Sequence, residues 1–152
     1  MILLLALWLS ATPKAVLVDR IVATVDDRVI TTSLVDQRMV RFKETREQAL
    51  TSLIERLLIT RACRAVGLEV TPNDVESALA EIISKNQLTQ PQFEHELKRQ
   101  GWELAAYKLE VQGQLLELKW LTLGAERGKE LGPERERLLK ALAKTAVIEV
   151  RK

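Results

Sequence analysis

His95 is the only histidine of the chain, and it lies between two acids in the sequence Glu94-His95-Glu96. A histidine beside carboxylates could transfer protons or bind a metal ion. A metal site needs further ligands, however, and the chain has no second histidine and only one cysteine. We therefore interpret His95 as an exposed helix residue between two solvated acids, and we expect no metal site.

Cys63 is the only cysteine, so no internal disulfide can form. Its neighbours at helical spacing are apolar, namely Leu58, Ile59, Ala62 and Val66. A reactive thiol needs an exposed and basic setting, whereas a free cysteine among such neighbours behaves as a small buried hydrophobe. The chain also contains no glycine-rich phosphate loop, nucleophile elbow or paired-acid motif. We therefore expect a protein that is not an enzyme and that needs no cofactor.

The composition is that of one ordinary globular domain. The chain has 152 residues, of which 47% are hydrophobic and 29% are charged. Its 23 basic and 21 acidic residues are interleaved and leave a net charge of +2, whereas a nucleic-acid-binding protein normally has a concentrated basic face. Aromatic residues make up only 4%, too few for base-stacking platforms. These features argue against a nucleic-acid partner.

The start of the chain resembles an export signal. Residues 1–11, MILLLALWLSA, form a continuous apolar run that is shorter than the about 20 residues of a membrane span. We predict a signal peptide over residues 1–15 and a single mature domain over residues 16–152, so we expect an exported protein. Two features depart from the usual pattern, because no basic residue precedes the run and Pro13 lies near the cleavage site. The alternative is an N-terminal core strand or helix.

Both ends of the mature chain have strand character. Residues 18–25 alternate and are rich in β-branched side chains, residues 26–28 have turn chemistry, and residues 29–31 return as a second strand. Such a hairpin is too small to be stable alone. Residues 146–150, AVIEV, alternate in the same way and can supply its partner. We therefore predict that the two ends of the mature chain meet in one small sheet.

Helix starts are marked by capping residues, each followed three residues later by a polar partner. The pairs are Ser33 with Asp36, Thr45 with Gln48, Thr71 with Asp74, and Thr89 with Gln92, while Gly67 and Gly101 mark helix ends and Pro133 opens a last helix. The predicted fold is mainly α with a small β-sheet. In this fold a multi-helix bundle carries an N-terminal hairpin, which the returning segment 133–152 joins with its C-terminal strand.

A long helix is predicted over residues 102–123, and it has two apolar stripes. The first stripe holds Trp102, Ala106, Leu109, Gly113, Leu116 and Trp120, and the second holds Leu104, Tyr107, Val111, Leu115 and Leu118. At about 100° per residue, the stripes fall on nearly opposite sides of a helix about 33 Å long. One side can support the core. The other side needs a second partner, either within the chain or in a complex.

Five segments occur in order along residues 18–97. They are VDRIVATVDDRVIT at 18–31, LIERLLI at 53–59, GLEVT at 67–71, NQLT at 86–89 and FEHEL at 93–97. Together they resemble the N-terminal domain of SurA-type periplasmic chaperones, over most of residues 18–123. Residues 133–150 are similar to the segment that returns after the parvulin domains in that family. The resemblance implies a chaperone that holds unfolded outer-membrane proteins in the periplasm without a nucleotide.

The chain departs from the family pattern at one point. One or two parvulin prolyl-isomerase domains usually lie between the long helix and the returning segment, and here only residues 124–132 occupy that place. His95 alone also cannot supply the paired histidines of a parvulin site. The resemblance therefore implies the chaperone core without isomerase activity.

A holding chaperone needs exposed apolar surface with a polar rim. The second stripe of the long helix could supply this surface, with neighbouring apolar side chains as its walls. The predicted peptide-binding residues are Met39, Phe42, Phe93, Leu97, Tyr107, Val111 and Leu115. The alternative is that both stripes belong to the core, one covered by the bundle and the other by the terminal helix or a second protomer.

Three classes of function therefore remain. The first is a periplasmic chaperone whose partners are unfolded polypeptides, above all outer-membrane proteins. The second is a structural or adaptor subunit with one specific periplasmic partner. The third is a membrane-tethered assembly factor, which requires that the N-terminal segment is retained. A homodimer is compatible with each of them.

Overall fold

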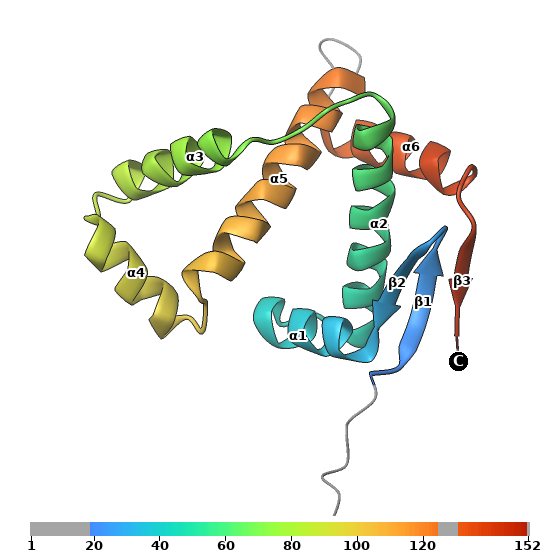
Figure 1. Cartoon of the computed structure of the whole chain (residues 1–152), viewed down its shortest axis with the longest axis horizontal. Helices are drawn as coiled ribbons and strands as arrows, with labels where there is room; N and C mark the ends of the chain where they lie inside the picture. Colours follow the sequence, from blue (N-terminus) through green and yellow to red (C-terminus); the bar gives the residue numbers. More distant parts are fainter. Residues whose placement is uncertain (1–18, 125–130, 152) are drawn as a thin grey trace, which may run out of the picture.

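The computed structural model of this protein describes residues 19–124 and 131–151, and Figure 1 shows their arrangement. The signal peptide predicted over residues 1–15 lies outside the described residues. The elements follow the order β1 (Ile21–Val25), β2 (Arg28–Thr31), α1 (Thr32–Phe42), α2 (Arg46–Ala65), α3 (Pro72–Lys85), α4 (Gln90–Arg99), α5 (Leu104–Gly124), α6 (Leu131–Ala143) and β3 (Ile148–Val150). The prediction of a mainly α fold with a small sheet is confirmed.

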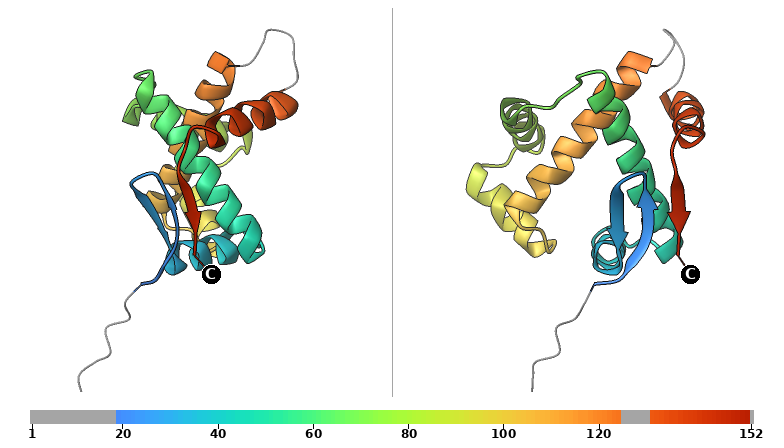
Figure 2. Two further views of the ribbon diagram at one scale, coloured as in Figure 1. Left: turned by 90° about the vertical axis from the view of Figure 1, so that its right-hand side faces the viewer. Right: turned by 45° about the vertical axis from the view of Figure 1, so that its right-hand side comes forward.

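The two ends of the described chain meet in one antiparallel sheet, with strand order β2-β1-β3. In this sheet Thr24 faces Glu149, and the Arg151 amide donates a hydrogen bond of 2.8 Å to the Val22 carbonyl. The Asp26 amide donates one of 2.8 Å to the Val147 carbonyl. Both views in Figure 2 show β3 beside β1, so the predicted pairing of the tail with the hairpin is confirmed.

The capping pairs mark three of the four predicted helix starts. Thr45 with Gln48 and Thr71 with Asp74 form complete capping boxes. At α4, the Gln92 side chain accepts a 2.8 Å hydrogen bond from the Thr89 amide. These contacts span only three residues, so the local sequence is sufficient to form them.

The predicted cap at Ser33 is wrong. Helix α1 begins at Thr32 with Thr31 at the N-cap position, which places Ser33 inside the first turn. Asp19 lies beside this turn, and its Oδ1 atom accepts a 3.0 Å hydrogen bond from the Ser33 amide, while its Oδ2 atom accepts one from the Ser33 hydroxyl. The hairpin returns the chain to its own start, so a carboxylate from before β1 replaces a local cap. These hydrogen bonds lower the pKa of Asp19.

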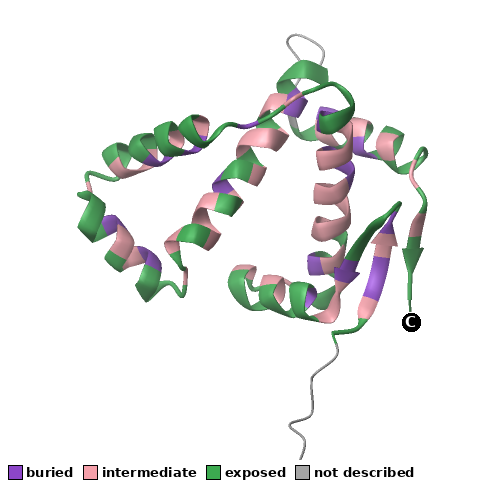
Figure 3. Ribbon diagram, viewed as in Figure 1, coloured by how far each residue is buried: buried purple, intermediate pink, exposed green. Residues whose placement is uncertain are grey.

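Three separate clusters of buried side chains hold the elements together. The body cluster lies between the sheet, α1 and α2, and it contains Val22, Ala23, Ile30, Val35 and Ala49. The junction cluster joins α2, α5 and α6 through Ile59, Cys63, Trp120, Leu121 and Leu139. The arm cluster joins α3, α4 and α5 through Val70, Val75, Leu79, Phe93, Leu97 and Val111. Figure 3 shows that the outer sides of α3 and α4 are exposed, whereas their buried positions face inward.

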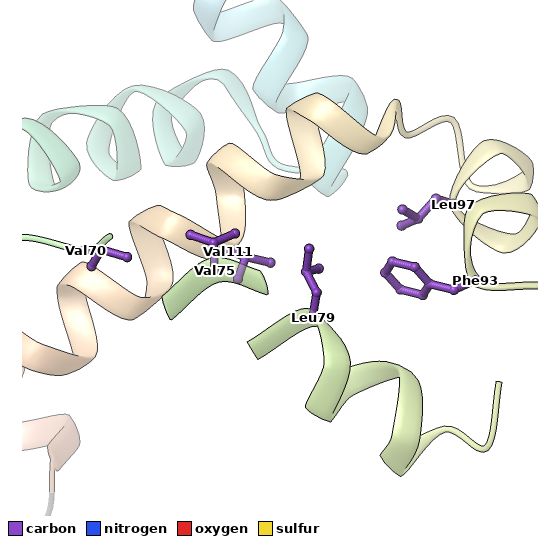
Figure 4. Close-up of a cluster of buried hydrophobic side chains, with 6 residues drawn as sticks. All are labelled: Val70, Val75, Leu79, Phe93, Leu97 and Val111. Atoms are coloured by element: carbon purple, nitrogen blue, oxygen red, sulfur yellow. The ribbon is translucent and has the colours of Figure 1, made fainter. Parts of the chain in front are cut away.

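Helix α5 packs against two clusters, whereas Leu109 and Leu118 of its stripes stay exposed. Leu116 and Trp120 of the first stripe pack in the junction cluster, against α2 and α6. Val111 of the second stripe packs against α3 and α4 in the arm cluster, as Figure 4 shows. Cys63 is only 1% exposed at the junction, and burial raises the pKa of its thiol, as expected for a small buried hydrophobe.

Candidate functional site

A cavity of about 490 Å³ lies between α2, α5 and the segment that leads from α2 into α3. We call it the α2–α5 groove. Its lining residues are Arg56, Ile59, Thr60, Cys63, Arg64, Leu68, Glu69, Val70, Leu109, Gln112, Gly113, Leu116 and Glu117. The buried members among them are all apolar, whereas charged side chains stand at the more exposed positions. The groove thus combines an apolar floor with a charged rim.

The mouth of the groove exposes an apolar side chain beside a cation. Leu109 of α5 is 66% exposed, although it lines the cavity. Arg64 of α2 is also exposed, and none of the ion pairs or side-chain hydrogen bonds within residues 19–124 and 131–151 includes it. An exposed apolar group beside an exposed cation suits a ligand that carries apolar side chains and carbonyl or carboxylate oxygens.

Gly113 allows α2 and α5 to approach each other along this groove. A Cβ atom at this position would lie 3.1 Å from the Arg56 guanidinium carbon, closer than atoms normally pack. Because the glycine leaves this space open, the guanidinium lies against α5, and its Nη2 atom donates a 2.7 Å hydrogen bond to Glu110. Burial alone would raise the pKa of Glu110, but the hydrogen bond and charge of Arg56 outweigh it, so this pKa is lowered.

Ion pairs fix the helices that form the groove. Arg135 of α6 bridges Glu55 of α2, at 2.8 Å, and Glu117 of α5. Lys119 of α5 donates to the Asp74 carboxylate at 2.9 Å and to the Glu69 carbonyl at 3.0 Å. The Lys119–Glu69 hydrogen bond holds the segment between α2 and α3, which lines the groove. The shape of the groove therefore does not depend on hydrophobic packing alone.

We expect the Lys119–Asp74 pair to contribute to the loss of stability in acid. Lys119 and the Thr71 cap lower the pKa of Asp74 from 3.8 to about 2. Because the folded-state pKa lies below the unfolded-state value, the stabilisation is present above about pH 4 and is lost as the pH falls towards 2. In Asp74→Asn the urea midpoint should therefore fall less steeply between pH 5 and pH 2 than in the wild type. Urea titrations monitored by circular dichroism at several pH values measure this slope.

Removing the other partner provides the control for this prediction. Lys119→Met should also flatten the slope, since it deletes the group that contributes most to the low pKa of Asp74. The double variant should then behave like Asp74→Asn. A slope that is unchanged in Asp74→Asn would show that the pair does not couple to folding.

The predicted peptide-binding residues are distributed over the fold. Phe93, Leu97 and Val111 are 5%, 5% and 4% exposed, and they form much of the arm cluster (Figure 4). Tyr107 and Leu115 are half-buried against the same cluster. Met39 is half-buried against the body cluster instead, and Phe42 is half-buried at the end of α1. None of these seven residues lines the α2–α5 groove, and their role in peptide binding remains a prediction.

The structure does bring three of the predicted residues into one chain of aromatic contacts. Phe93 meets Tyr107 at a centroid distance of 5.6 Å, Tyr107 meets Trp102 at 5.4 Å, and Trp102 meets Phe42 at 5.7 Å, all edge to face. The Arg41 guanidinium lies 4.3 Å from the centroid of the Trp102 ring. This chain connects α1 to α4 and α5. Trp102 lies between Tyr107 and Phe42 in it, although the sequence placed Trp102 only in a helix stripe.

Sequence reasoning missed the groove residues because they come from two distant helices. Arg56 and Leu109 are ordinary helix residues, and only their meeting across α2 and α5 makes a cavity. The sequence did place Leu109, Gly113 and Leu116 together in the first stripe, and Gly113 stood out as a glycine inside a long helix, where it costs about 1 kcal/mol relative to alanine. Such a position suggests a close approach by another group, but it does not identify Arg56 as that group.

His95 is an exposed residue of α4, as the sequence indicated. Within residues 19–124 and 131–151, no three histidine, cysteine or acidic side chains gather in a way that could hold a metal ion. Over the same residues, no helix combines the length and the apolar character needed to cross a membrane.

Comparison with known proteins points to one family. The family model described as the SurA N-terminal domain matches residues 18–119. The putative peptidyl-prolyl cis-trans isomerase SurA of Haemophilus influenzae is 28% identical over 113 residues, which cover 74% of this chain and 34% of that protein. The chaperone SurA of Dechloromonas aromatica is 28% identical over 131 residues, which cover 76% of this chain and 30% of that protein.

A solved structure has a similar fold. The structure comes from a study of Campylobacter jejuni that describes the virulence factor PEB4 and the periplasmic protein Cj1289 as two structurally related SurA-like chaperones. The TM-score is 0.57 at 25% identity, over 72% of this chain and 43% of that one. The two curated relatives are much longer than this chain, which spans about a third of their length.

Proposed function

Because the chain belongs to the SurA N-terminal domain family, we propose that it acts as a periplasmic chaperone that holds unfolded polypeptides without ATP. The observation that carries this proposal is the α2–α5 groove, with its apolar floor and its exposed Leu109. A holding chaperone must accept many sequences, and an open groove with an apolar floor and a charged rim meets this need. Its clients would include unfolded outer-membrane proteins.

The dimensions of the groove suit a short part of an extended chain. Its volume of about 490 Å³ falls within the range of small-ligand pockets, about 300–1,000 Å³. It would therefore take a few side chains of a client rather than a folded domain. Arg64 lies at the rim, where it would pair with client carbonyl or carboxylate oxygens. Binding of this kind needs no energy source, because release follows when the client folds.

We also propose that these 152 residues do not catalyse prolyl isomerisation. The family match covers the N-terminal chaperone domain, and His95, the only histidine, is exposed on α4 away from the groove. The proposed activity is therefore the holding of clients and not the interconversion of their proline peptide bonds.

Two leucines of α5 provide a matched test. Leu109 lines the groove and is 66% exposed, whereas Leu123 does not line it and is 64% exposed. Leu109→Ser should weaken client binding about fivefold, because burying a leucine side chain contributes about 1.5–3 kcal/mol and a client would cover only part of it. Leu123→Ser should have little effect. Light scattering of a urea-unfolded outer-membrane protein diluted into each variant without ATP measures the difference.

Both leucines are exposed, so neither substitution should unfold the protein, and circular dichroism verifies this. Equal suppression of aggregation by the two variants and the wild type would exclude the groove as the binding site. A wild-type protein that leaves aggregation unchanged would exclude the holding activity itself.

A further inference from the structure

The outer edge of β3 presents backbone groups that point away from the sheet. Val147 and Arg151 direct their backbone groups towards β1, as the hydrogen bonds with Asp26 and Val22 show. In an antiparallel pair, successive residues point to opposite edges, so Ile148 and Val150 direct their N–H and C=O groups outward. Among the described elements, no further strand pairs with this edge.

An apolar cavity adjoins this open edge. It has a volume of about 540 Å³ and lies between α2, α6 and β3. Ile148 lines it from the sheet, Ile54 and Leu58 line it from α2, and Leu139 and Ala143 line it from α6. Figure 2 shows β3 at the margin of the sheet, next to the lower part of α2 and below α6. The cavity shares no lining residue with the α2–α5 groove.

The charges around the cavity are already paired. Arg135 bridges Glu55 and Glu117, and Lys140 lies 2.7 Å from Glu136. A charged ligand would have to compete with these ion pairs, whereas an uncharged apolar side chain would not. The cavity is thus suited to an aliphatic or aromatic side chain.

We propose that an extended polypeptide segment with alternating apolar residues adds to β3 as a fourth strand and places one apolar side chain in this cavity. The outward N–H and C=O groups of Ile148 and Val150 have the spacing that another extended backbone matches. A residue beside Ile148 on the added strand points to the same face of the sheet, where the cavity opens. Backbone pairing supplies affinity for many sequences, and the cavity supplies the preference for an apolar side chain.

This site is distinct from the groove of the proposed function, and its test uses direct peptide binding. The probe is a ten-residue synthetic peptide of alternating valine and threonine with lysine at each end, labelled with fluorescein. A second version is N-methylated at every internal residue, so that neither of its edges can donate backbone hydrogen bonds to β3. The unmodified peptide should bind the full chain, and the amides of Ile148 and Val150 should then exchange with solvent more slowly.

Val150→Pro is the decisive variant, because it removes one outward N–H group and leaves the inward groups of Glu149 and Arg151 in place. It should weaken peptide binding about fivefold, the loss expected for one net hydrogen bond. Val150→Thr keeps the N–H group and should bind within about twofold of the wild type. Ala143→Phe, at an exposed position, fills the cavity and should weaken binding without affecting the sheet.

Several outcomes would overturn the proposal. One is unchanged affinity in both Val150→Pro and Ala143→Phe, and another is equal binding of the N-methylated peptide. Protection of the Ile148 and Val150 amides that rises with protein concentration in the absence of peptide would instead assign this edge to a second copy of the chain. If the holding activity were absent but the peptide still bound, the proposed function would fail and the binding site at β3 would still be supported.

Discussion

Replacing Phe93 with alanine should lower the free energy of unfolding by about 3–5 kcal/mol, the range measured for buried aromatic residues that leave a cavity. Phe93 is 5% exposed in the arm cluster, and its ring meets Tyr107 edge to face. Figure 4 shows the ring pointing from α4 towards Leu79 of α3. Urea unfolding monitored by circular dichroism measures the loss.

The same helix supplies the control. His95 is exposed on α4, two residues from Phe93, and His95→Ala should change stability by no more than about 0.5 kcal/mol. If Phe93→Ala instead kept its stability but lost the suppression of client aggregation, Phe93 would be a contact for clients, as the sequence suggested. The experiment therefore decides between the two roles that an apolar stripe allows.

Phe93→Ala should lower local stability most in α3, α4 and α5, which form the arm cluster. The arm cluster and the body cluster share no buried residue, so weakened packing between α3, α4 and α5 need not reach the sheet directly. Amide hydrogen exchange in Phe93→Ala should accelerate first in α3 and α4, while the amide of Ala23, which is fully buried in β1, stays protected. We expect α3 and α4 to exchange before Ala23 because the arm cluster and the body cluster are separate.

Contacts that are close in sequence could be predicted, because their geometry depends on a few residues. The Thr45 and Thr71 capping boxes are of this kind. The pairing of β3 with β1 is long-range, but it too could be predicted, since a lone hairpin needs a third strand and only residues 146–150 alternate suitably. The alternation of apolar residues did not predict which residues of the two strands pair; in the structure Thr24 lies opposite Glu149.

Contacts that arise only when distant elements meet could not be predicted. Asp19 reaches Ser33 because the hairpin brings the chain back, and a local capping rule therefore selected the wrong residue. Arg56 fits against Gly113 because two helices cross there. Periodicity identified both apolar sides of α5 but not what covers each side. For this reason Val111 could be named as a binding residue and yet lie in the arm cluster.

The second large effect on stability concerns the C-terminal segment, in which α6 leads into β3. Leu139 of α6 is 7% exposed and packs in the junction cluster with Trp120 and Leu121 of α5. In Leu139→Asp a carboxylate would be buried there without a partner, at a cost of about 3–5 kcal/mol. Ala141→Asp, on the exposed side of the same helix, should cost less than about 0.5 kcal/mol. Thermal unfolding measures both changes.

The consequence should extend beyond α6, because this helix leads directly into β3. When Leu139→Asp releases α6, β3 is held by its short pairing with β1, three residue pairs flanked by the Asp26–Val147 and Arg151–Val22 hydrogen bonds, and such a short strand is marginal without packing behind it. Release of β3 would uncover the edge of β1 and promote association between chains. Leu139→Asp should therefore elute partly as oligomers in size-exclusion chromatography, and the β1 amides should exchange faster. If the variant remained monomeric and as stable as Ala141→Asp, the tail would not be what closes this fold.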